Sequence, residues 1–213
     1  MGGGVAERLL ALAGLVALAP VLLAVAAAIA LDDGFPVVYR QSRVGRNGAS
    51  FLLVKFRSMR RGSGGVRITA SGDARLTRCG DFLRRYKLDE LLQLWNVVKG
   101  DMSLIGPRPE VAEFVDSTDP VWRAVLAVRP GITDLASLVY RNEEEVLAAA
   151  SDRVRHYREV VLPAKLALNL EYLRRRSLWL DVKLICLTAR YSLLPSGFDP
   201  ERIKRAFSIG AAA

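Results

Sequence analysis

Histidine and cysteine are scarce in this chain, and their scarcity excludes several kinds of site. Among 213 residues there is one histidine, His156, and two cysteines, Cys79 and Cys186, which are far apart and form no CxxC or Cys/His grouping. A multi-histidine metal centre is therefore excluded, and a Ser-His-Asp triad would need His156 itself as its base. Without a zinc or redox motif, we expect the cysteines to be reduced.

Aromatic residues are also few, at 8%, whereas basic residues outnumber acidic ones and give a net charge of +9. A basic surface attracts nucleic acid, anionic lipid or phosphorylated substrates. The low aromatic content and the lack of a recognised binding motif disfavour nucleic acid. We therefore predict no nucleic-acid partner, which leaves lipid and phosphorylated substrates.

One long apolar run, from Leu9 to Leu31, contains no charged side chain. As a helix it would extend roughly 35 Å, enough to cross a bilayer core. Pro20 lies in the middle and should kink or break the helix. A kinked span and a helix-break-helix hairpin both fit, and the residue pattern alone favours the span. In either case the basic remainder should be cytoplasmic.

The rest of the chain predicts a domain of α/β class, mainly α with a small β-hairpin. The runs PVVYRQ and SFLLVKF flank an Asn47-Gly48 turn signal, and a glycine- and serine-rich loop follows from Arg61 to Asp73. Further elements are expected as follows: a helix over Leu88–Lys99 with Leu88, Leu91, Leu92 and Trp95 on its apolar face, a helix over Asp119–Val128, a helix from Glu143, a break at Pro163, and a helix over Leu178–Leu194. The last suits either a membrane surface or a protein core.

Basic residues gather between the hairpin and the helix predicted at Leu88. They are Arg40, Arg43, Arg46, Lys55, Arg57, Arg60, Arg61, Arg75, Arg78, Arg84, Arg85 and Lys87. They could form a solvated or lipid-docking surface. Lys55 and Arg57, however, flank Phe56 in an apolar run, where a cation needs a counter-charge such as a phosphate.

Asp89 and Glu90 form the acidic pair nearest this cluster. As residues of a first helical turn they could simply cap the helix and complement its dipole. Alternatively, one carboxylate attacks a phosphorus atom while both help to hold Mg²⁺, with the cations neutralising phosphate oxygens. In the GPRPE segment, two prolines hold Arg108 in an extended loop, and its planar fork suits phosphate or carboxylate.

The motifs YRQSRVG, KFRSM, FLRRYKLDELLQLWNVVKGDMSLIGPRP, RPGIT and YLRRRSLWLDVKLICLTA occur in this order. With them the chain closely resembles the bacterial sugar transferases, the monotopic polyprenyl-phosphate phosphoglycosyl transferases, in their minimal single-domain form. The resemblance runs from the apolar segment to about Pro195. It implies transfer of a phospho-sugar from a UDP-sugar to a polyprenyl (undecaprenyl) phosphate with release of UMP, which initiates membrane-linked glycan assembly.

The resemblance also implies roles for individual residues. Asp89 matches the nucleophile that forms a covalent phospho-sugar intermediate, Glu90 assists it, and Mg²⁺ bridges the pair and the diphosphate. The cations that match substrate-phosphate or nucleotide-binding positions are Lys55, Arg57, Arg84 and Arg108. The implied location is the bacterial inner membrane, in contact with its lipid and with the catalytic domain on the cytoplasmic face. A homodimer is left open.

The resemblance reverses the expectation for the apolar run, because the family uses a re-entrant helix broken at Ser-Pro, here Ala19-Pro20. We therefore predict a re-entrant membrane helix over residues 1–33, broken at Pro20, and a catalytic domain over residues 34–213 with amphipathic helices at the membrane interface. Leu92 replaces a family proline. Asp134 and Ser137 replace a common glycine and glutamine in a region expected to face the sugar or nucleotide.

A rival from another class is a non-catalytic, membrane-anchored basic module that binds anionic lipid or nucleic acid. It predicts salt-sensitive binding without a requirement for Mg²⁺. It gives no reason for two acids inside a basic cluster. The sequence does not identify the sugar or the glycan.

Overall fold

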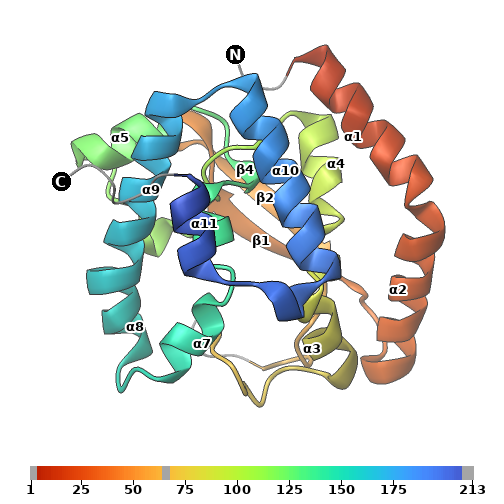
Figure 1. Cartoon of the computed structure of the whole chain (residues 1–213). Coiled ribbons are helices and arrows are strands. Elements are labelled where there is room, and N and C mark those ends of the chain that lie inside the picture. Colours follow the sequence, from red (N-terminus) through yellow and green to blue (C-terminus); the bar gives the residue numbers. More distant parts are fainter. Residues whose placement is uncertain (1–3, 64–67, 208–213) are drawn as a thin grey trace.

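The structure is a computed structural model that describes residues 4–63 and 68–207, so part of the loop predicted over 61–73 lies outside the described residues. Helices surround two small sheets (Figure 1). The helices are α1 (Val5–Ala17), α2 (Ala19–Asp33), α3 (Arg78–Arg85), α4 (Gln93–Lys99), α5 (Pro120–Leu126), α6 (Leu135–Val139), α7 (Glu143–Ala148), α8 (Arg153–His156), α9 (Leu162–Arg175), α10 (Leu178–Leu193) and α11 (Pro200–Ala206). The strands are β1 (Val38–Val44), β2 (Ser50–Phe56), β3 (Ser103–Ile105) and β4 (Gly131–Thr133). The predicted class, mainly α with a small β part, is confirmed.

The predicted hairpin is present as β1 and β2, which pair antiparallel from Val38 opposite Phe56 to Val44 opposite Ser50. Asn47 and Gly48 have φ of 57° and 78° at the turn. Asparagine and glycine tolerate this left-handed region better than other residues, which explains the turn signal. The hairpin lies in the middle of the fold (Figure 1), and Lys55 and Arg57 lie at the end of β2 and just beyond it.

The other sheet was not predicted from the sequence. β3 and β4 pair in parallel, with Ser103 opposite Gly131 and Ile105 opposite Thr133. Each strand has three residues, too few to give an alternating pattern. Their pairing brings the GPRPE loop, which follows β3, beside the RPGIT segment that contains β4.

The apolar N-terminal run forms two helices, α1 and α2, which meet at Leu18 and are bent by 60° relative to each other. Pro20 lies in the first turn of α2, where its missing N–H costs nothing. The Leu18 N–H bonds to the carbonyls of Gly14 and Val16. The predicted break is thus present without a serine hydroxyl. Among the described helices, none alone is long and apolar enough to cross a bilayer. The bent pair taken together meets this requirement in length and composition only.

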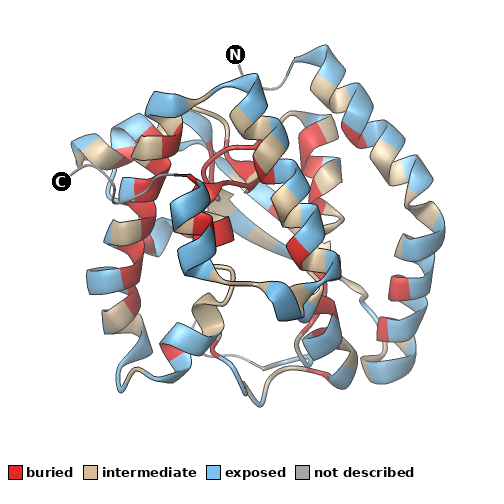
Figure 2. Ribbon diagram, in the orientation of Figure 1, coloured by how far each residue is buried: buried red, intermediate tan, exposed pale blue. Residues whose placement is uncertain are grey.

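Both ends of this bent pair contact the rest of the protein. Near the start of α1, the Glu7 carboxylate accepts the Leu104 N–H at 2.5 Å. At the end of α2, the Asp32 carboxylate accepts the Cys79 N–H at 2.9 Å. In Figure 1, α1 runs beside α4 and α2 reaches α3. The bend itself lies at the edge of the molecule, and much of its apolar surface is exposed (Figure 2).

The helix predicted over Leu88–Lys99 is shorter, and its buried face is not the predicted one. A 3₁₀ turn, η2 (Leu88–Glu90), precedes α4. The residues that α4 buries are Gln93, Asn96 and Val97, whereas Trp95 is 48% exposed. The Asn96 amide bonds the Val54 N–H and the Leu52 carbonyl of β2 at 3.0 and 2.7 Å, so a polar side chain belongs on the inner face.

The helices predicted at Asp119, Glu143 and Leu178 agree closely with the structure, whereas the break predicted at Pro163 is wrong. Asp119 caps α5, α7 begins at Glu143, and α10 covers Leu178–Leu193. Pro163 does not break a helix: it lies in the first turn of α9, directly after the π-helical turn η4 (Tyr157–Val161). α9 buries its inner face in the core (Figure 2). α10 buries Leu184 and Tyr191 but exposes Leu178 and Trp179 by 82% and 77%.

Candidate active site

The two predicted acids lie in η2, between α3 and α4. Lys87 precedes them with φ 56° and ψ 22°, a left-handed conformation that costs energy for a residue other than glycine. It turns the chain sharply after α3. Neither η2 nor α4 has a side-chain cap hydrogen bond. The simple capping interpretation of Asp89 and Glu90 is therefore not what the structure shows.

Glu90 is paired with Arg108 from the GPRPE loop. The guanidinium donates two parallel hydrogen bonds, at 2.8 and 2.6 Å, to the two carboxylate oxygens. Burial would raise the pKa of Glu90, but the charges of Arg108 and Lys87 and the Arg108 hydrogen bonds lower it to about 2. Glu90 is therefore ionised throughout the neutral range. A bidentate fork of this kind also fixes the orientation of both side chains.

Asp89 is only 4% exposed, and its Oδ1 is buried with no hydrogen-bond partner among the described residues. Burial and the neighbouring charge of Glu90 raise the pKa of Asp89, against the opposing effect of Lys55. An unpartnered buried carboxylate oxygen is costly for a fold. Unpartnered buried carboxylates of this kind are found at functional sites, which makes Asp89 a candidate ligand-binding group.

The cations that lower the pKa of Asp89 most are Lys55, Lys87 and Arg84. Lys55 extends from the end of β2, and burial lowers its pKa to about 8, although Asp89 and Glu90 oppose this. Arg84 also pairs with Glu144 of α7, with its Nε 2.9 Å from Oε1. Lys87 lowers the pKa of both acids. The sequence pattern included Lys87 in the basic cluster but gave it no role.

Arg57 is engaged elsewhere. Its NH2 donates to the backbone carbonyls of Asp33 and Gly34 at 2.8 and 2.7 Å and lies 3.2 Å from the Asp33 carboxylate. It thereby holds the last turn of α2, whose free carbonyls attract a cation. Its contacts thus join the apolar segment to β2, and its assignment to substrate phosphate stays a prediction. Lys55, Arg84 and Arg108, by contrast, surround the acidic pair.

Asp134 belongs to the segment that the resemblance led us to expect beside the sugar or nucleotide. It is fully buried, and its carboxylate accepts the N–H of Ser137 at 2.5 Å and the N–H of Arg108 at 3.2 Å. Asp134 thus contacts the backbone of Arg108. No sequence signal marks this contact, because it depends on the unpredicted pairing of β3 with β4.

The residues present fit Mg²⁺. Within residues 4–63 and 68–207, no group of three His, Cys, Asp or Glu side chains could hold a metal ion. Mg²⁺ at phosphoryl-transfer sites, however, uses one or two carboxylates together with substrate phosphates and water. The unpartnered Oδ1 of Asp89 could serve as one such carboxylate ligand of Mg²⁺. Both oxygens of Glu90 already accept hydrogen bonds from Arg108.

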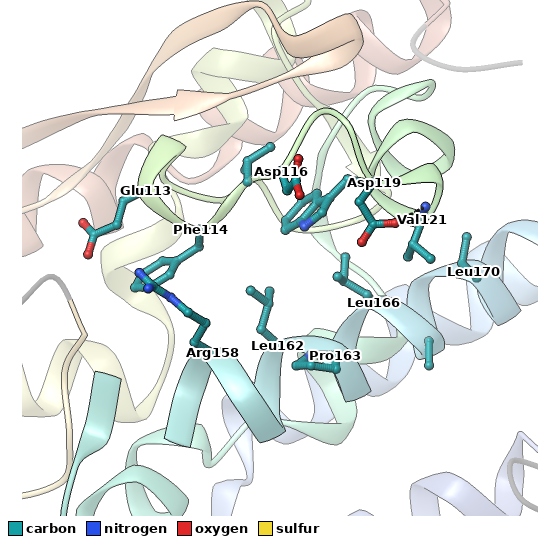
Figure 3. A pocket seen from close by; sticks show the side chains of 13 residues that line it. Glu113, Phe114, Asp116, Asp119, Val121, Arg158, Leu162, Pro163, Leu166 and Leu170 are labelled. Atoms are coloured by element: carbon teal, nitrogen blue, oxygen red, sulfur yellow. Dashed lines mark hydrogen bonds between the residues drawn. The ribbon is translucent and has the colours of Figure 1, made fainter. Parts of the chain in front are cut away.

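An apolar pocket of about 480 Å³ lies away from the acidic pair, between η3 (Ala112–Phe114), α5 and α9 (Figure 3). Leu162, Leu166 and Leu170 of α9 form one wall. Arg158 covers the ring of Phe114 at 5.5 Å from its centroid. None of the predicted site residues lines this pocket, so it is not the site that the sequence indicates.

Buried carboxylates set among cations define a site suited to chemistry on a phosphate. Comparison with known proteins agrees with this class. A family model described as bacterial sugar transferase matches residues 4–194. The chain therefore belongs to the bacterial sugar transferase family, as its motifs predict.

The chain is 40% identical over 183 residues to UDP-N-acetylgalactosamine-undecaprenyl-phosphate N-acetylgalactosaminephosphotransferase of Aeromonas hydrophila, covering 84% of this chain and 40% of the relative. It is 37% identical over 190 residues to UDP-glucose:undecaprenyl-phosphate glucose-1-phosphate transferase of Xanthomonas campestris pv. campestris, covering 86% and 37%. An uncharacterized sugar transferase of Bacillus subtilis is 32% identical over 84% of this chain and 81% of its own length. The chain thus spans less than half the length of the first two relatives.

Proposed function

We propose that this protein is a phosphoglycosyl transferase that moves a sugar phosphate from a UDP-sugar to a polyprenyl phosphate in the bacterial inner membrane and releases UMP. The observation that carries the proposal is the buried Asp89 with its unpartnered oxygen, beside the Glu90–Arg108 pair, in a chain of this family. The names of two relatives, from Aeromonas and Xanthomonas, support the donor and acceptor classes.

The reaction has two half-reactions at one phosphorus atom. In the first, a carboxylate oxygen of Asp89 bonds to the phosphorus that carries the sugar, and the bond from that phosphorus to the bridging oxygen breaks. The bridging oxygen leaves with UMP. In the second, an oxygen of polyprenyl phosphate attacks the same phosphorus and the aspartyl bond breaks, which restores the carboxylate. Aspartate carboxylates can form such phosphoryl intermediates. The intermediate divides one difficult displacement into two easier ones.

The surrounding residues have distinct parts. Lys55, Arg84 and Lys87 neutralise the phosphate oxygens that approach Asp89, since a phosphate cannot meet a bare carboxylate without counter-charge. Glu90 holds the Arg108 fork, whose side chain is only partly buried, so that Arg108 can also neutralise the phosphate. Asp89, with Glu90 beside it, would hold Mg²⁺. When bound, the ion would neutralise the diphosphate and favour departure of UMP.

The bent helix pair is proposed to enter and leave the same leaflet. Glu7 near its start and Asp32 at its end both bond to the domain that contains the acids. A spanning helix would separate these ends by the bilayer thickness. The exposed apolar residues of α10, Leu178 and Trp179, suit the interface of the same leaflet. The acids would then lie at the cytoplasmic face, within reach of a lipid-linked phosphate.

Activity is tested by UMP release from purified protein with undecaprenyl phosphate and Mg²⁺. Because the relatives' names cite different sugars, the donors should include UDP-N-acetylgalactosamine and UDP-glucose. We expect multiple turnovers with one donor and none after Mg²⁺ is chelated. No UMP with any donor, together with salt-sensitive binding to anionic vesicles, would instead support a non-catalytic basic module.

Topology is tested by cysteine labelling at Val5, which is 75% exposed. Cys79 and Cys186 are first replaced by serine, and activity confirms the background. In intact cells, Val5→Cys should resist a membrane-impermeant thiol reagent and react only after the inner membrane is opened. Reaction from the periplasm would contradict the re-entrant arrangement.

A further inference from the structure

The loop that carries Arg108 is locked against the segment that follows β4. The Gly106 N–H donates to the Thr133 carbonyl and the Gly131 N–H to the Pro107 carbonyl, both at 3.0 Å. A Cβ on Gly131 would lie 2.1 Å from the Gly106 nitrogen, so these backbones approach as only glycine allows. The residue that follows Thr133 therefore lies next to the backbone of Arg108.

That residue is Asp134, whose two carboxylate oxygens have different partners. Oδ1 accepts the Ser137 N–H at 2.5 Å and caps α6. Oδ2 accepts the Arg108 N–H at 3.2 Å. Capping needs only the first of these bonds. The second joins α6 to the backbone of the residue whose guanidinium grips Glu90.

The side chain itself is fully buried. Burial raises the pKa of Asp134, whereas its hydrogen bonds from Ser137 and the charge of Lys165 lower it. A carboxylate is an expensive residue for a helix cap in the interior, where an uncharged cap would serve. An aspartate at this position is explained by its two acceptor oxygens, one for the Ser137 N–H and one for the Arg108 N–H.

We propose that Asp134 is a positioning residue that fixes the backbone of Arg108, so that the guanidinium fork meets both Glu90 and the incoming phosphate. The inference rests on the proposed transferase function and adds a residue to it. Asp134 acts through Arg108 and does not touch substrate. A displacement of Arg108 by about 1 Å would be enough to lower turnover substantially.

The contact lets positioning be separated from mere support of the fold. Asp134 bonds the backbone N–H of Arg108, which survives in Arg108→Ala, while the side chain that it positions is lost. Stability and activity should therefore respond differently in a double-mutant cycle of Asp134→Ala and Arg108→Ala.

In the wild-type background, Asp134→Ala should lower kcat/KM for UMP release by roughly 10- to 100-fold. In the Arg108→Ala background the same change should lower it less than about twofold, because there is no fork left to position. The fall in Tm caused by Asp134→Ala should be equal in both backgrounds. An equal fold-loss of activity in both backgrounds would mean that Asp134 only supports the fold, and would overturn the proposal.

Two further variants sharpen the result. Asp134→Asn has one acceptor oxygen for two N–H donors, so it should retain most of the Tm while kcat/KM falls. Asp119→Ala removes the cap of α5, where the aspartate carboxylate accepts the Val121 N–H at 2.8 Å. It should lower Tm with kcat/KM unchanged once the folded fraction is matched.

The same four proteins of the cycle are titrated with UDP in the presence of Mg²⁺ by calorimetry. This readout does not need turnover, so it separates the two proposals. If wild-type protein binds UDP but releases no UMP, the proposed function fails, and the cycle in UDP affinity still decides the role of Asp134. Non-additive losses of affinity support positioning, and additive losses contradict it.

Discussion

Asp89 and Glu90 are neighbours in the chain, but their carboxylates are held in opposite ways. Both carboxylate oxygens of Glu90 accept hydrogen bonds from Arg108, and the pKa of Glu90 is lowered to about 2. Asp89 is buried with one oxygen unpartnered, and its pKa is raised. Environments that push the pKa values of two adjacent acids apart assign them different roles. Under the proposed function, Glu90 anchors Arg108 and Asp89 is the group that reacts.

The largest effect should come from Asp89→Asn, which removes the free carboxylate. UMP release should fall by at least roughly 10³-fold, as expected when a nucleophile is lost. The protein should remain folded, because the amide relieves a buried charge. Steady-state UMP release and Tm measure the two effects. Asp81→Asn, an exposed acid in the first turn of α3, is the matched control and should retain activity. Sustained activity in Asp89→Asn would reverse the roles of the two acids.

Removing the anchor should have the next largest effect. Arg108→Ala leaves Glu90 partly buried and unpaired, so we expect UMP release to fall roughly 10²-fold and Tm to fall as well. Arg108→Lys keeps the charge but not the fork, and should recover stability more than activity. Full activity in Arg108→Lys would show that only the positive charge matters at this position. It would contradict the claim that the two-bond geometry between Arg108 and Glu90 is needed for activity.

The pH dependence separates the two sides of the site. The carboxylate of Asp89 must be ionised, so kcat/KM should fall at acid pH, beginning above the ordinary aspartate pKa because that pKa is raised. It should also fall above about pH 8, where Lys55 loses its charge. Glu90, with a pKa of about 2, should leave no mark.

Lys55→Arg tests the alkaline limb. Arginine keeps its charge at high pH, so the fall above about pH 8 should disappear. Stability should change in the opposite sense to activity. Because the pKa of Lys55 is lower in the folded protein than its ordinary 10.5, the unfolded chain binds more protons between about pH 8 and 10.5. The Lys55 contribution to the free energy of unfolding therefore rises with pH in that window. An alkaline limb that persists in Lys55→Arg would assign it to another group.

The smallest effect should come from Lys87, whose charge lowers the pKa of both acids. Lys87→Asn removes that charge, and asparagine tolerates the left-handed backbone at this position. We expect a fall in kcat/KM of only a few-fold and a shift of the acid limb to higher pH. A loss as large as that of Arg108→Ala would mean that Lys87 contacts the substrate directly.

Local features of the fold could be predicted from the sequence. Asn47-Gly48 fixes the hairpin turn, Asp119 precedes a proline at the start of α5, and Pro20 breaks the apolar run. Each depends on residues adjacent in the chain. The ordered motifs likewise indicated the family and the acidic pair.

Long-range features could not be predicted. Asn96 is buried because it bonds the backbone of β2, although apolar periodicity favoured Trp95 on the inner face. Arg57 binds the backbone carbonyls at the end of α2, a contact that the sequence did not predict. Asp134 reaches Arg108 only because two three-residue strands pair. In all three cases a polar group meets a backbone partner that is distant in sequence, and no local pattern records such a contact.

The central claim is that Asp89, not Glu90, becomes covalently bonded to the phospho-sugar. The most direct test is to incubate the protein with its UDP-sugar and Mg²⁺ without acceptor, quench, and map the peptides by mass spectrometry. We predict that the peptide containing both acids gains the mass of one sugar phosphate, located by fragmentation on Asp89, and loses it when undecaprenyl phosphate is added before quenching. An adduct on Glu90, or UMP formed only when both substrates are present and with no adduct on either acid, would contradict the account.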